Sequence, residues 1–362
     1  MTSALGERLA REIRRRGPID MAELMTLALH HPTEGYYATK DPLGAAGDFT
    51  TAPEISQVFG ELIGLALAQS WLDRGRPAPC HLIELGPGRG TLMADALRAS
   101  ATVPGFLGCI RLHLVETSPA LKAHQLSILG EHGPIWHEDI QDLPEDGPLL
   151  IVANEFLDAL PIHQYVRQSG RWLERCVGVD EQGALGLVAE PRPGLASSGL
   201  LPAAPEGTVL ELSPARDALV EELARRLARQ GGLALLIDYG RMGPVGDSLQ
   251  AVQRHRKVDL LHEPGECDLS SHVDFAAVAA AVVRAGCPAY GLIDQALFLE
   301  RLGLSTRRAK LMRNRSEAEV LVIEEAIDRL IDPLGMGELF KVLALGTGPV
   351  PPGFLGQEGT DP

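Results

Sequence analysis

Apolar residues in the middle of the chain fall into short runs that alternate with helical patterns. Near-continuous apolar runs of this length are typical of strands that are buried on both faces. Because helical segments separate the runs, the pattern predicts an α/β fold with a parallel sheet covered by helices. The runs are CHLIEL (80–85), RLHLVE (111–116), PIWH (134–137), PLLIVA (148–153), LALLIDY (233–239) and LFKVLAL (339–345).

Two regions depart from this alternation. Residues 161–179 alternate apolar and polar side chains around Ser169 and Gly170, which predicts a β-hairpin. Residues 239–271 show little periodicity, and a connection of that length predicts a loop that is either functional or disordered. Its basic cluster suits an acidic partner, or is simply a solvated face. The cluster consists of Arg254, His255, Arg256 and Lys257.

The ends of the chain differ from the middle. Residues 1–75 are predicted to form a helical N-terminal lobe, in which Asp20 and Glu23 are spaced as a capping box at the start of a helix. The remaining boundaries are a main domain at 76–348, an insertion at about 162–230 and a flexible tail at 349–362.

Composition and charge narrow the class of protein. The chain has 362 residues, 45% of them hydrophobic, which is enough for a large core. Its formal net charge of −15 argues against a general affinity for nucleic acid or anionic lipid. The five cysteines are scattered, which predicts reduced thiols in a cytosol-like compartment and no metal site. No apolar run reaches the length that spans a membrane.

The first apolar run leads into a glycine-rich turn. Gly86, Gly88 and Gly90 alternate with other residues before a helical pattern begins. A turn without side chains lets a ligand approach the main chain, and the helix start beyond it offers free N–H groups. The G-x-G-x-G spacing differs from the G-x-G-x-x-G fingerprint of dinucleotide-binding folds. The turn therefore favours a nucleotide-type ligand of another kind.

Glu84 indicates which ligand this is. Its carboxylate stands two residues before Gly86, where it would repel a pyrophosphate and favour a cationic amino-acid group. S-adenosyl-L-methionine carries an α-ammonium, a sulfonium and an adenosine. Glu116, at the end of the next run, suits the ribose hydroxyls. Asp139 and Ile140 follow the run after that, and suit the adenine amino group and ring face, although Asp139 alone is equally explained as a solvated acid.

Strings along the chain, among them ELGPGRGTL and NEFLDALPIHQ, resemble those of a known family, the MidA-like S-adenosylmethionine-dependent methyltransferases. The resemblance extends from about Leu24 to Leu345. It implies a Rossmann-like, seven-stranded methyltransferase sheet whose last strand is antiparallel. The strings that carry it are HHPTEGYY, GDFTTAPEISQVFGELIG, ELGPGRGTL, NEFLDALPIHQ, DYG, GDSLQAV, SHVDF and MGELFKVL.

The same resemblance implies a function and further site residues. Asn154 and Glu155, directly after the run at 148–153, would border the transferred methyl group. The eukaryotic members lie in the mitochondrial matrix and assemble respiratory complex I by methylating an arginine of its 49 kDa subunit. A bacterial member would be cytoplasmic. A protein substrate and a possible homodimer are therefore expected, with no nucleic acid and no membrane span.

Methylation of an arginine requires carboxylates. A guanidinium has a pKa above about 12, so its nitrogen needs an acid that orients it and accepts its proton. Glu155 and Asp158 offer such a pair after the fourth run, although Asp158 is equally explained as a helix cap. His163 could relay a proton, or could be a half-buried strand residue.

The string GDFTTAPEISQVFGE predicts a loop that folds over the cofactor and substrate as a lid. Its candidate residues are Asp48, Phe49, Pro53 and Glu54, and without the resemblance Thr51 reads as the cap of a helix with Pro53 in its first turn. Three functions remain open: a protein arginine methyltransferase, a methyltransferase of a small molecule or another side chain, and a non-catalytic assembly factor.

Overall fold

The computed structural model describes residues 3–39, 50–194 and 201–355. Its contacts divide the chain into two compact units. Unit 1 comprises residues 1–49, 158–217 and 241–277, and unit 2 comprises residues 50–157, 218–240 and 278–362. This grouping differs from the predicted lobe at 1–75, because the segment from 50 onward packs with the large sheet of unit 2.

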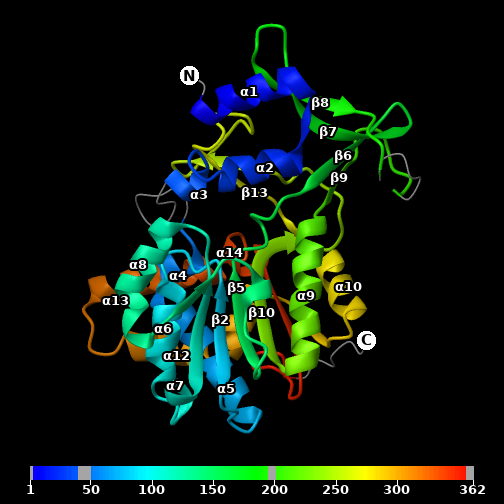
Figure 1. Ribbon diagram of the computed structural model, residues 1–362. Helices are drawn as coiled ribbons and strands as arrows, with labels where there is room; N and C mark the ends of the chain where they lie inside the picture. The colour runs from blue at the N-terminus through cyan, green and yellow to red at the C-terminus, as the bar shows by residue number, and fades with distance from the viewer. Residues whose placement is uncertain (1–2, 40–49, 195–200, 356–362) are drawn as a thin grey trace. The chain divides into compact units, whose positions relative to one another are not determined.

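Unit 2 is built on a mostly parallel sheet, and the six apolar runs all form strands of it (Figure 1). Seven strands follow one another in the order β15-β16-β10-β5-β2-β3-β4. β10 runs parallel to β5, whereas β16 is antiparallel to both β10 and β15, so the predicted antiparallel last strand is confirmed. The strands are β2 (Cys80–Leu85), β3 (Ile110–Val115), β4 (Ile135–His137), β5 (Leu149–Asn154), β10 (Gly232–Arg241), β15 (Ala289–Asp294) and β16 (Phe340–Thr347).

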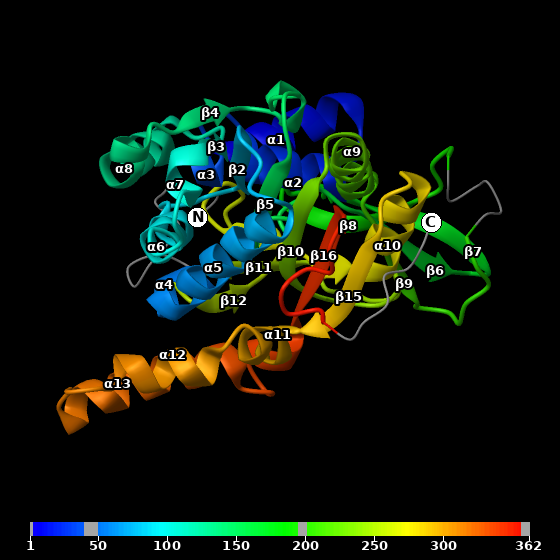
Figure 2. The same ribbon diagram turned by 90° about the horizontal axis from the view of Figure 1, so that it is seen from below.

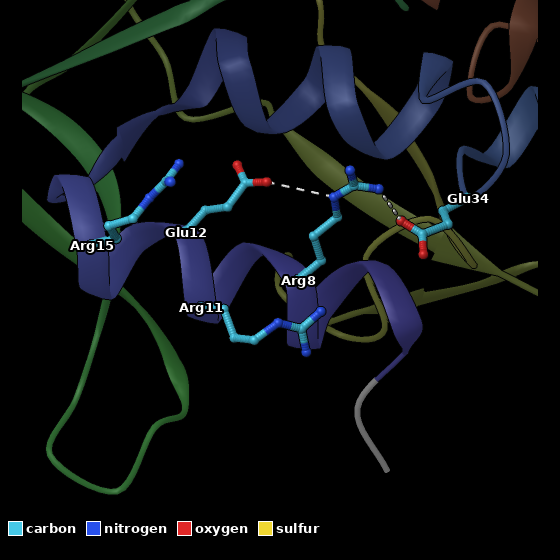
Figure 3. A pocket seen from close by; sticks show the side chains of 5 residues that line it. All are labelled: Arg8, Arg11, Glu12, Arg15 and Glu34. Carbon is cyan, nitrogen blue, oxygen red and sulfur yellow. Dashed lines mark hydrogen bonds and ion pairs between the residues drawn. The ribbon is translucent and has the colours of Figure 1, made fainter.

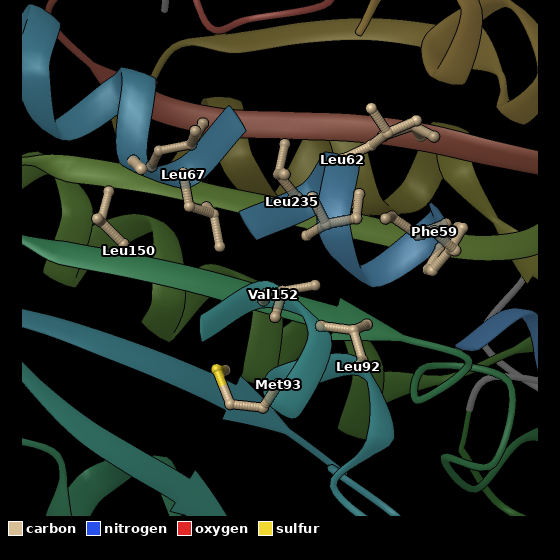
Figure 4. Close-up of a cluster of buried hydrophobic side chains, with 14 of the residues drawn as sticks. Phe59, Leu62, Leu67, Leu92, Met93, Leu150, Val152 and Leu235 are labelled. Carbon is tan, nitrogen blue, oxygen red and sulfur yellow. The ribbon is translucent and has the colours of Figure 1, made fainter. Parts of the chain in front are cut away.

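One face of this sheet is covered by α5 (Gln57–Asp73) and α6 (Thr91–Ser100), as Figure 4 shows. Phe59 and Leu62 of α5 pack into the same buried cluster as Val152 of β5 and Leu235 of β10. The two helices lie unusually close, because a Cβ on Gly64 would come within 2.4 Å of the Ala96 backbone. A larger residue at 64 would push α5 and α6 apart.

The other face is covered by α9 (Pro214–Gln230) and α10 (Phe275–Arg284), which lie on the side of the sheet opposite α5 in Figure 2. The apolar stripe of α9, from Val220 to Leu227, is fully buried. The remaining elements of unit 2 are α4 (Ala52–Ile55), α7 (Phe106–Cys109), α8 (Pro119–Leu129), α11 (Gln295–Arg301), α12 (Leu304–Leu311), α13 (Glu317–Ile331), α14 (Met336–Leu339) and the 3-10 turns η1 (Gly130–His132) and η2 (Ile140–Asp142).

Three histidines form a hydrogen-bonded chain across β2, β3 and β4. Nδ1 of His81 lies 3.0 Å from Nε2 of His113, whose Nδ1 lies 2.9 Å from Nε2 of His137. Burial, and then the two neighbouring rings, lower the pKa of His113 to about 4. His113 is therefore uncharged at neutral pH.

Part of the C-terminal segment that was predicted to be flexible packs against the core. Phe354 is fully buried, and its ring centroid lies 5.5 Å from that of Phe298. The tail predicted to be flexible from residue 349 therefore packs against the core at this point, because the apolar side chain of Phe354 outweighs the Pro- and Gly-rich composition around it. Residues 356–362 lie outside the described part of the chain.

Unit 1 contains an antiparallel sheet in the order β1-β7-β6-β9, with β8 paired to β7. The hairpin predicted at 161–179 is confirmed as β6 and β7, which turn at Ser169 and Gly170. The strands are β1 (Ile19–Asp20), β6 (His163–Gln168), β7 (Arg171–Val179), β8 (Leu185–Glu190) and β9 (Val209–Leu212), and the helices are α1 (Ala4–Arg16), α2 (Met21–His30) and α3 (Tyr36–Thr39).

The loop predicted at 239–271 is wrong in part. Residues of this segment form a second small sheet of unit 1, with strands β11 (Gln250–Gln253), β12 (Arg256–Val258) and β13 (Asp268–Ser270) in the order β12-β11-β13. Strands of three or four residues are too short to show an alternating pattern, which is why the sequence did not reveal them. A further short strand, β14 (Val273–Asp274), precedes α10. Among the described helices, none combines the length and apolarity that crossing a bilayer requires.

Candidate functional site

The glycine-rich turn lies between β2 and α6 in unit 2. Gly86, Gly88 and Gly90 all have positive φ, at 64°, 53° and 82°, a region that other residues rarely adopt. A Cβ on Gly86 would come within 2.6 Å of the Phe156 ring. The turn therefore needs glycine both for its backbone path and for the ring packed against it.

Glu84 is a buried acid that forms no ion pair with the residues the structure describes. It is 3% exposed, and one of its oxygens, Oε2, has no hydrogen-bond partner among the residues the structure describes. Burial raises the pKa of Glu84 to about 8. A buried carboxyl group with an oxygen that lacks a donor is suited to accept a hydrogen bond from a cationic group. The α-ammonium of S-adenosylmethionine would supply such a donor.

Asn154 provides a second buried acceptor at the end of the neighbouring strand. β2 and β5 pair in parallel, with Leu85 opposite Ala153, so Glu84 and Asn154 lie at the same edge of the sheet. Oδ1 of Asn154 also has no partner within the described part of the chain. Two buried acceptors that lack donors fit a ligand that brings N–H groups, such as the amino-acid part of this cofactor.

Glu116 is held in place by a residue that the sequence analysis did not identify. Gln125 of α8 is fully buried, and its Nε2 donates to the carbonyl of Gly88 at 2.7 Å and to Oε2 of Glu116 at 3.3 Å. Its Oε1 accepts from the indole of Trp136 at 2.7 Å. Burial raises the pKa of Glu116, and the N–H of Ser118 and the Gln125 amide oppose that rise. Gln125 thus connects the glycine turn with the acid expected to bind the ribose.

Asp139 and Ile140 lie where β4 ends. Asp139 is exposed, and its Oδ1 accepts from the N–H of Gln141 at 2.9 Å, so it caps the turn η2. Ile140 is buried. The capping bond uses one carboxylate oxygen, and the adenine-binding roles of both residues stay predictions.

Glu155 follows β5 in a left-handed backbone conformation, with φ at 49°. A non-glycine residue in this region usually costs of order 1–3 kcal/mol, so the fold must hold it there. Its Oε1 accepts from the N–H of Ala52 at 2.9 Å and from Nδ2 of Asn154 at 3.0 Å. The carboxylate is therefore oriented by the start of α4 and by its own neighbour.

Asp238 stabilises the same turn from β10. It is fully buried, and one carboxylate oxygen accepts from the N–H groups of Phe156 at 3.2 Å and Leu157 at 2.9 Å. The other accepts from the N–H of Tyr239 at 2.9 Å. Asp238 is the first residue of the string DYG, which entered the sequence reasoning only through the family resemblance. An acid at the end of a buried strand is a signal that could have indicated its role in holding the turn.

Part of the predicted lid lies beside the glycine turn. Pro53 and Glu54 belong to α4, and Glu54 accepts a hydrogen bond from the hydroxyl of Thr91, the first residue of α6. The predicted helix start is confirmed, but the side chain of Thr51 makes no capping bond. The other two lid candidates, Asp48 and Phe49, lie outside the described residues.

Asp158 belongs to unit 1, where it lies near two other polar groups. Tyr37 donates to Oδ1 of Asp268 at 3.1 Å. Burial raises the pKa of Tyr37 well above its usual value, and the charges of Asp268 and Asp158 raise it further. Asp158 is 9% exposed and Asp268 is 7% exposed. The two carboxyl groups and the Tyr37 hydroxyl therefore form a buried polar cluster in unit 1.

His163 is the first residue of β6, also in unit 1. Its Nδ1 lies 2.8 Å from Oε1 of Glu174, and this hydrogen bond raises the pKa of His163. His163, Glu174 and Asp20 bring their ligand atoms within 4.8 Å of one another. Oδ1 of Asp20 already caps α2 at the N–H of Glu23, as predicted, so the group is accounted for as an ion-pair and capping cluster.

The fold and this strand edge define a class of protein. A glycine turn after the first parallel strand, an orphaned buried acid before it and a second acid after the next strand are the features of a Rossmann-like methyltransferase. The family comparison agrees: residues 62–293 match the family described as "Putative S-adenosyl-L-methionine-dependent methyltransferase". The chain belongs to this family, and its methyl donor is S-adenosyl-L-methionine.

Its curated relatives carry a more specific name. "Protein arginine methyltransferase NDUFAF7, mitochondrial" from Danio rerio is 37% identical, over 93% of this chain and 85% of the relative. The Homo sapiens protein of the same name is 34% identical, over 92% and 81%. A crystal structure from Burkholderia thailandensis, described as a "likely methyl transferase" bound to S-adenosyl-homocysteine, is 30% identical, with a TM-score of 0.84, over 98% of this chain and 95% of that one.

Proposed function

We propose that this methyltransferase transfers its methyl group to an arginine side chain of a protein. The observation that carries the proposal is Glu155, a carboxylate held in a left-handed turn directly after β5 and oriented by two donors. The relatives named as protein arginine methyltransferases support it.

The cofactor site would be formed at the carboxyl ends of β2, β3 and β5. Glu84 and Asn154 would accept from the α-ammonium, and the main chain at Gly86, Gly88 and Gly90 would lie against the ligand. Glu116, held by Gln125, would accept from the ribose hydroxyls. When bound, S-adenosylmethionine supplies an electrophilic methyl group on a sulfonium.

Glu155 would prepare the acceptor. A charged guanidinium has no free lone pair to offer. A carboxylate that pairs with one edge of it draws the positive charge toward that edge and raises the electron density on the reacting nitrogen. As the nitrogen forms its bond to the methyl carbon, the carbon–sulfur bond breaks and the nitrogen gives up a proton, for which Glu155 is the candidate base. Asp238 would keep Glu155 in position.

Two of the candidate catalytic residues lie in unit 1. Asp158, which is buried near Tyr37, is the proposed second carboxylate for the guanidinium. His163, with its raised pKa, is the proposed proton relay and holds its proton through Glu174. The lid role of Pro53 and Glu54 is supported by the hydrogen bond to Thr91.

The test combines acceptor identification with one variant. The protein is incubated with methyl-labelled S-adenosylmethionine and extract, and mass spectrometry locates the label. We expect it on arginine, and label found only on small molecules would contradict the proposal. Glu155→Gln should bind S-adenosylhomocysteine normally and lose transfer by about 10²- to 10⁴-fold. Glu131→Gln, at a carboxylate that is 82% exposed, should change neither.

The acceptor suggested by the resemblance is the 49 kDa subunit of respiratory complex I, which would make the protein an assembly factor. The relatives' names place them in mitochondria. A bacterial host would place this chain in the cytoplasm. Loss of the methylated arginine from that subunit in a deletion strain is the expected result, and full methylation there would contradict this acceptor.

A second copy of the chain is a further proposed partner. α13 exposes Leu321 and Val322, at 56% and 66%, and Figure 2 shows that α12 and α13 extend away from the sheet of unit 2. Such side chains suit burial against another subunit. Light scattering should give twice the monomer mass, and Leu321→Glu should reduce it to the monomer mass.

A further inference from the structure

Unit 1 contains two hollows that the proposed chemistry does not use. Their volumes are about 440 Å³ and 470 Å³, and their linings differ. The first lies along α1 (Figure 3). The second lies beside the strands β11 and β12.

The hollow along α1 has largely compensated charges. Arg8 pairs with Glu12 at 3.5 Å and with Glu34 at 3.1 Å, as the dashed lines in Figure 3 mark. Arg11, which is 69% exposed, pairs more loosely with Glu7 at 3.9 Å. Arg15 also lines this hollow, so three arginines face two glutamates there, and no apolar side chain is part of the lining.

The hollow beside β11 and β12 is different because apolar side chains form part of its lining, while the acids near it are also paired. Glu211 accepts from Arg241 at 2.9 Å and from the N–H groups of Ser248 and Leu249. Asp247 pairs with Arg175 at 2.7 Å. The negative charge near this hollow is therefore neutralised by its own neighbours.

Lys257 also lines this hollow. It is exposed at the hollow and forms no ion pair with any residue in the described ranges. His272 also lines the hollow, and burial, followed by the charge of Arg241 and of Lys257, lowers its pKa. The ring is therefore neutral at pH 7. Leu249, Val258 and Leu260 supply apolar walls.

The hairpin that carries Lys257 adds further positive charge. β11 and β12 pair from Ala251 opposite Val258 to Gln253 opposite Arg256, so Arg254 and His255 alone form the turn. Both have positive φ, at 51° and 59°, in a two-residue turn where Asn-Gly is the favoured sequence. Arg256 and Lys257 are neighbouring exposed cations of β12, on a chain whose net charge is −15.

We propose that this hollow and the β11–β12 hairpin bind an acidic segment of the protein acceptor, with one carboxylate side chain at Lys257 and its aliphatic neighbours against Leu249 and Leu260. The proposal rests on the proposed function, since it assumes that the acceptor is a protein. It assigns a role to the basic cluster that the cofactor site leaves unexplained. Positive charge at an exposed rim acts mainly on partner choice and association.

The test measures binding without methyl transfer. A fluorescein-labelled peptide of repeated Glu-Leu-Glu-Gly units is titrated with the full-length protein, and the same peptide with Gln in place of Glu is the comparison. We expect the acidic peptide to bind more tightly, and its affinity to fall as salt rises. Arg256→Glu combined with Lys257→Glu should weaken its binding by about tenfold or more, while Lys257→Arg retains it.

The control is Arg11→Glu, which makes the same charge change at an exposed residue of unit 1 outside this hollow. Equal binding of the two peptides, or equal weakening by Arg11→Glu, would overturn the proposal. An unchanged melting temperature and circular dichroism spectrum show that the double variant is folded. Arginine labelling is read in a separate assay, so failure of the proposed function and failure of this inference give different results.

Discussion

Replacing Glu84 with glutamine should make the ligand-free protein more stable and the cofactor complex weaker. In the unfolded chain this carboxyl has a pKa near 4.5, whereas burial raises it to about 8 in the folded protein. Below pH 4.5 both states hold the proton, so the group costs no stability there. As the pH rises toward 8, the unfolded chain releases its proton while the folded protein keeps it, and the free energy of unfolding falls.

The size of this effect follows from the two pKa values. A difference between 4.5 and about 8 corresponds to about 5 kcal/mol at and above pH 8, and to about 3 kcal/mol at pH 7. Glu84→Gln does not titrate and should recover most of this free energy. Urea unfolding of the ligand-free protein from pH 4.5 to 8 should show the gap between variant and wild type widening, with Glu131→Gln following the wild type.

The same substitution, Glu84→Gln, should weaken cofactor binding. At pH 7 roughly nine-tenths of Glu84 is protonated, so pairing with the α-ammonium should release most of one proton. Calorimetry with S-adenosylhomocysteine in buffers of different ionisation enthalpy measures that release. Glu84→Gln should abolish it and weaken binding roughly 10- to 100-fold. A variant that binds equally well and shows the wild-type pH dependence would refute the reasoning.

Three further predictions concern the surroundings of the site. Asp238→Asn places an amide against backbone N–H groups, so unfolding stability should fall by about 1–3 kcal/mol and kcat should fall with it; an unchanged kcat would separate Asp238 from Glu155. Gly86→Ala should weaken cofactor binding because its Cβ meets Phe156, and Phe156→Leu should partly restore it in calorimetry. His113 has its pKa lowered to about 4, so stability present above pH 6.5 should fall by up to about 3 kcal/mol as the pH drops to 4. His113→Leu should lack this loss in acid unfolding curves, and an identical curve would show that another group causes it.

The sequence predicted the main sheet well because its strands are buried on both faces. Runs such as 80–85 and 148–153 have no polar alternation that could be mistaken for a surface strand. The glycine turn was equally readable, because positive φ at three alternating positions leaves glycine as the ordinary choice. Both signals are local, so a single sequence is sufficient to detect them.

Other parts of the site depend on contacts between distant segments. Gln125 lies 37 residues from Gly88 in sequence, and nothing in the helix around it indicates that its amide is buried. Asp238 lies 82 residues from Phe156. The division into units was similarly hidden, because unit 1 is assembled from three separate stretches of the chain. Pairings of this kind appear only when the fold is known.

The position of the boundary between the units has an evolutionary consequence. The chain passes from unit 2 to unit 1 between Leu157 and Asp158, directly after the turn that holds Glu155, and again at the end of β10. It returns to unit 2 near the start of α9 and within α10. Every residue assigned to the methyl donor belongs to unit 2. Substitutions in the segments of unit 1 can therefore accumulate during evolution without altering the residues proposed to bind the methyl donor.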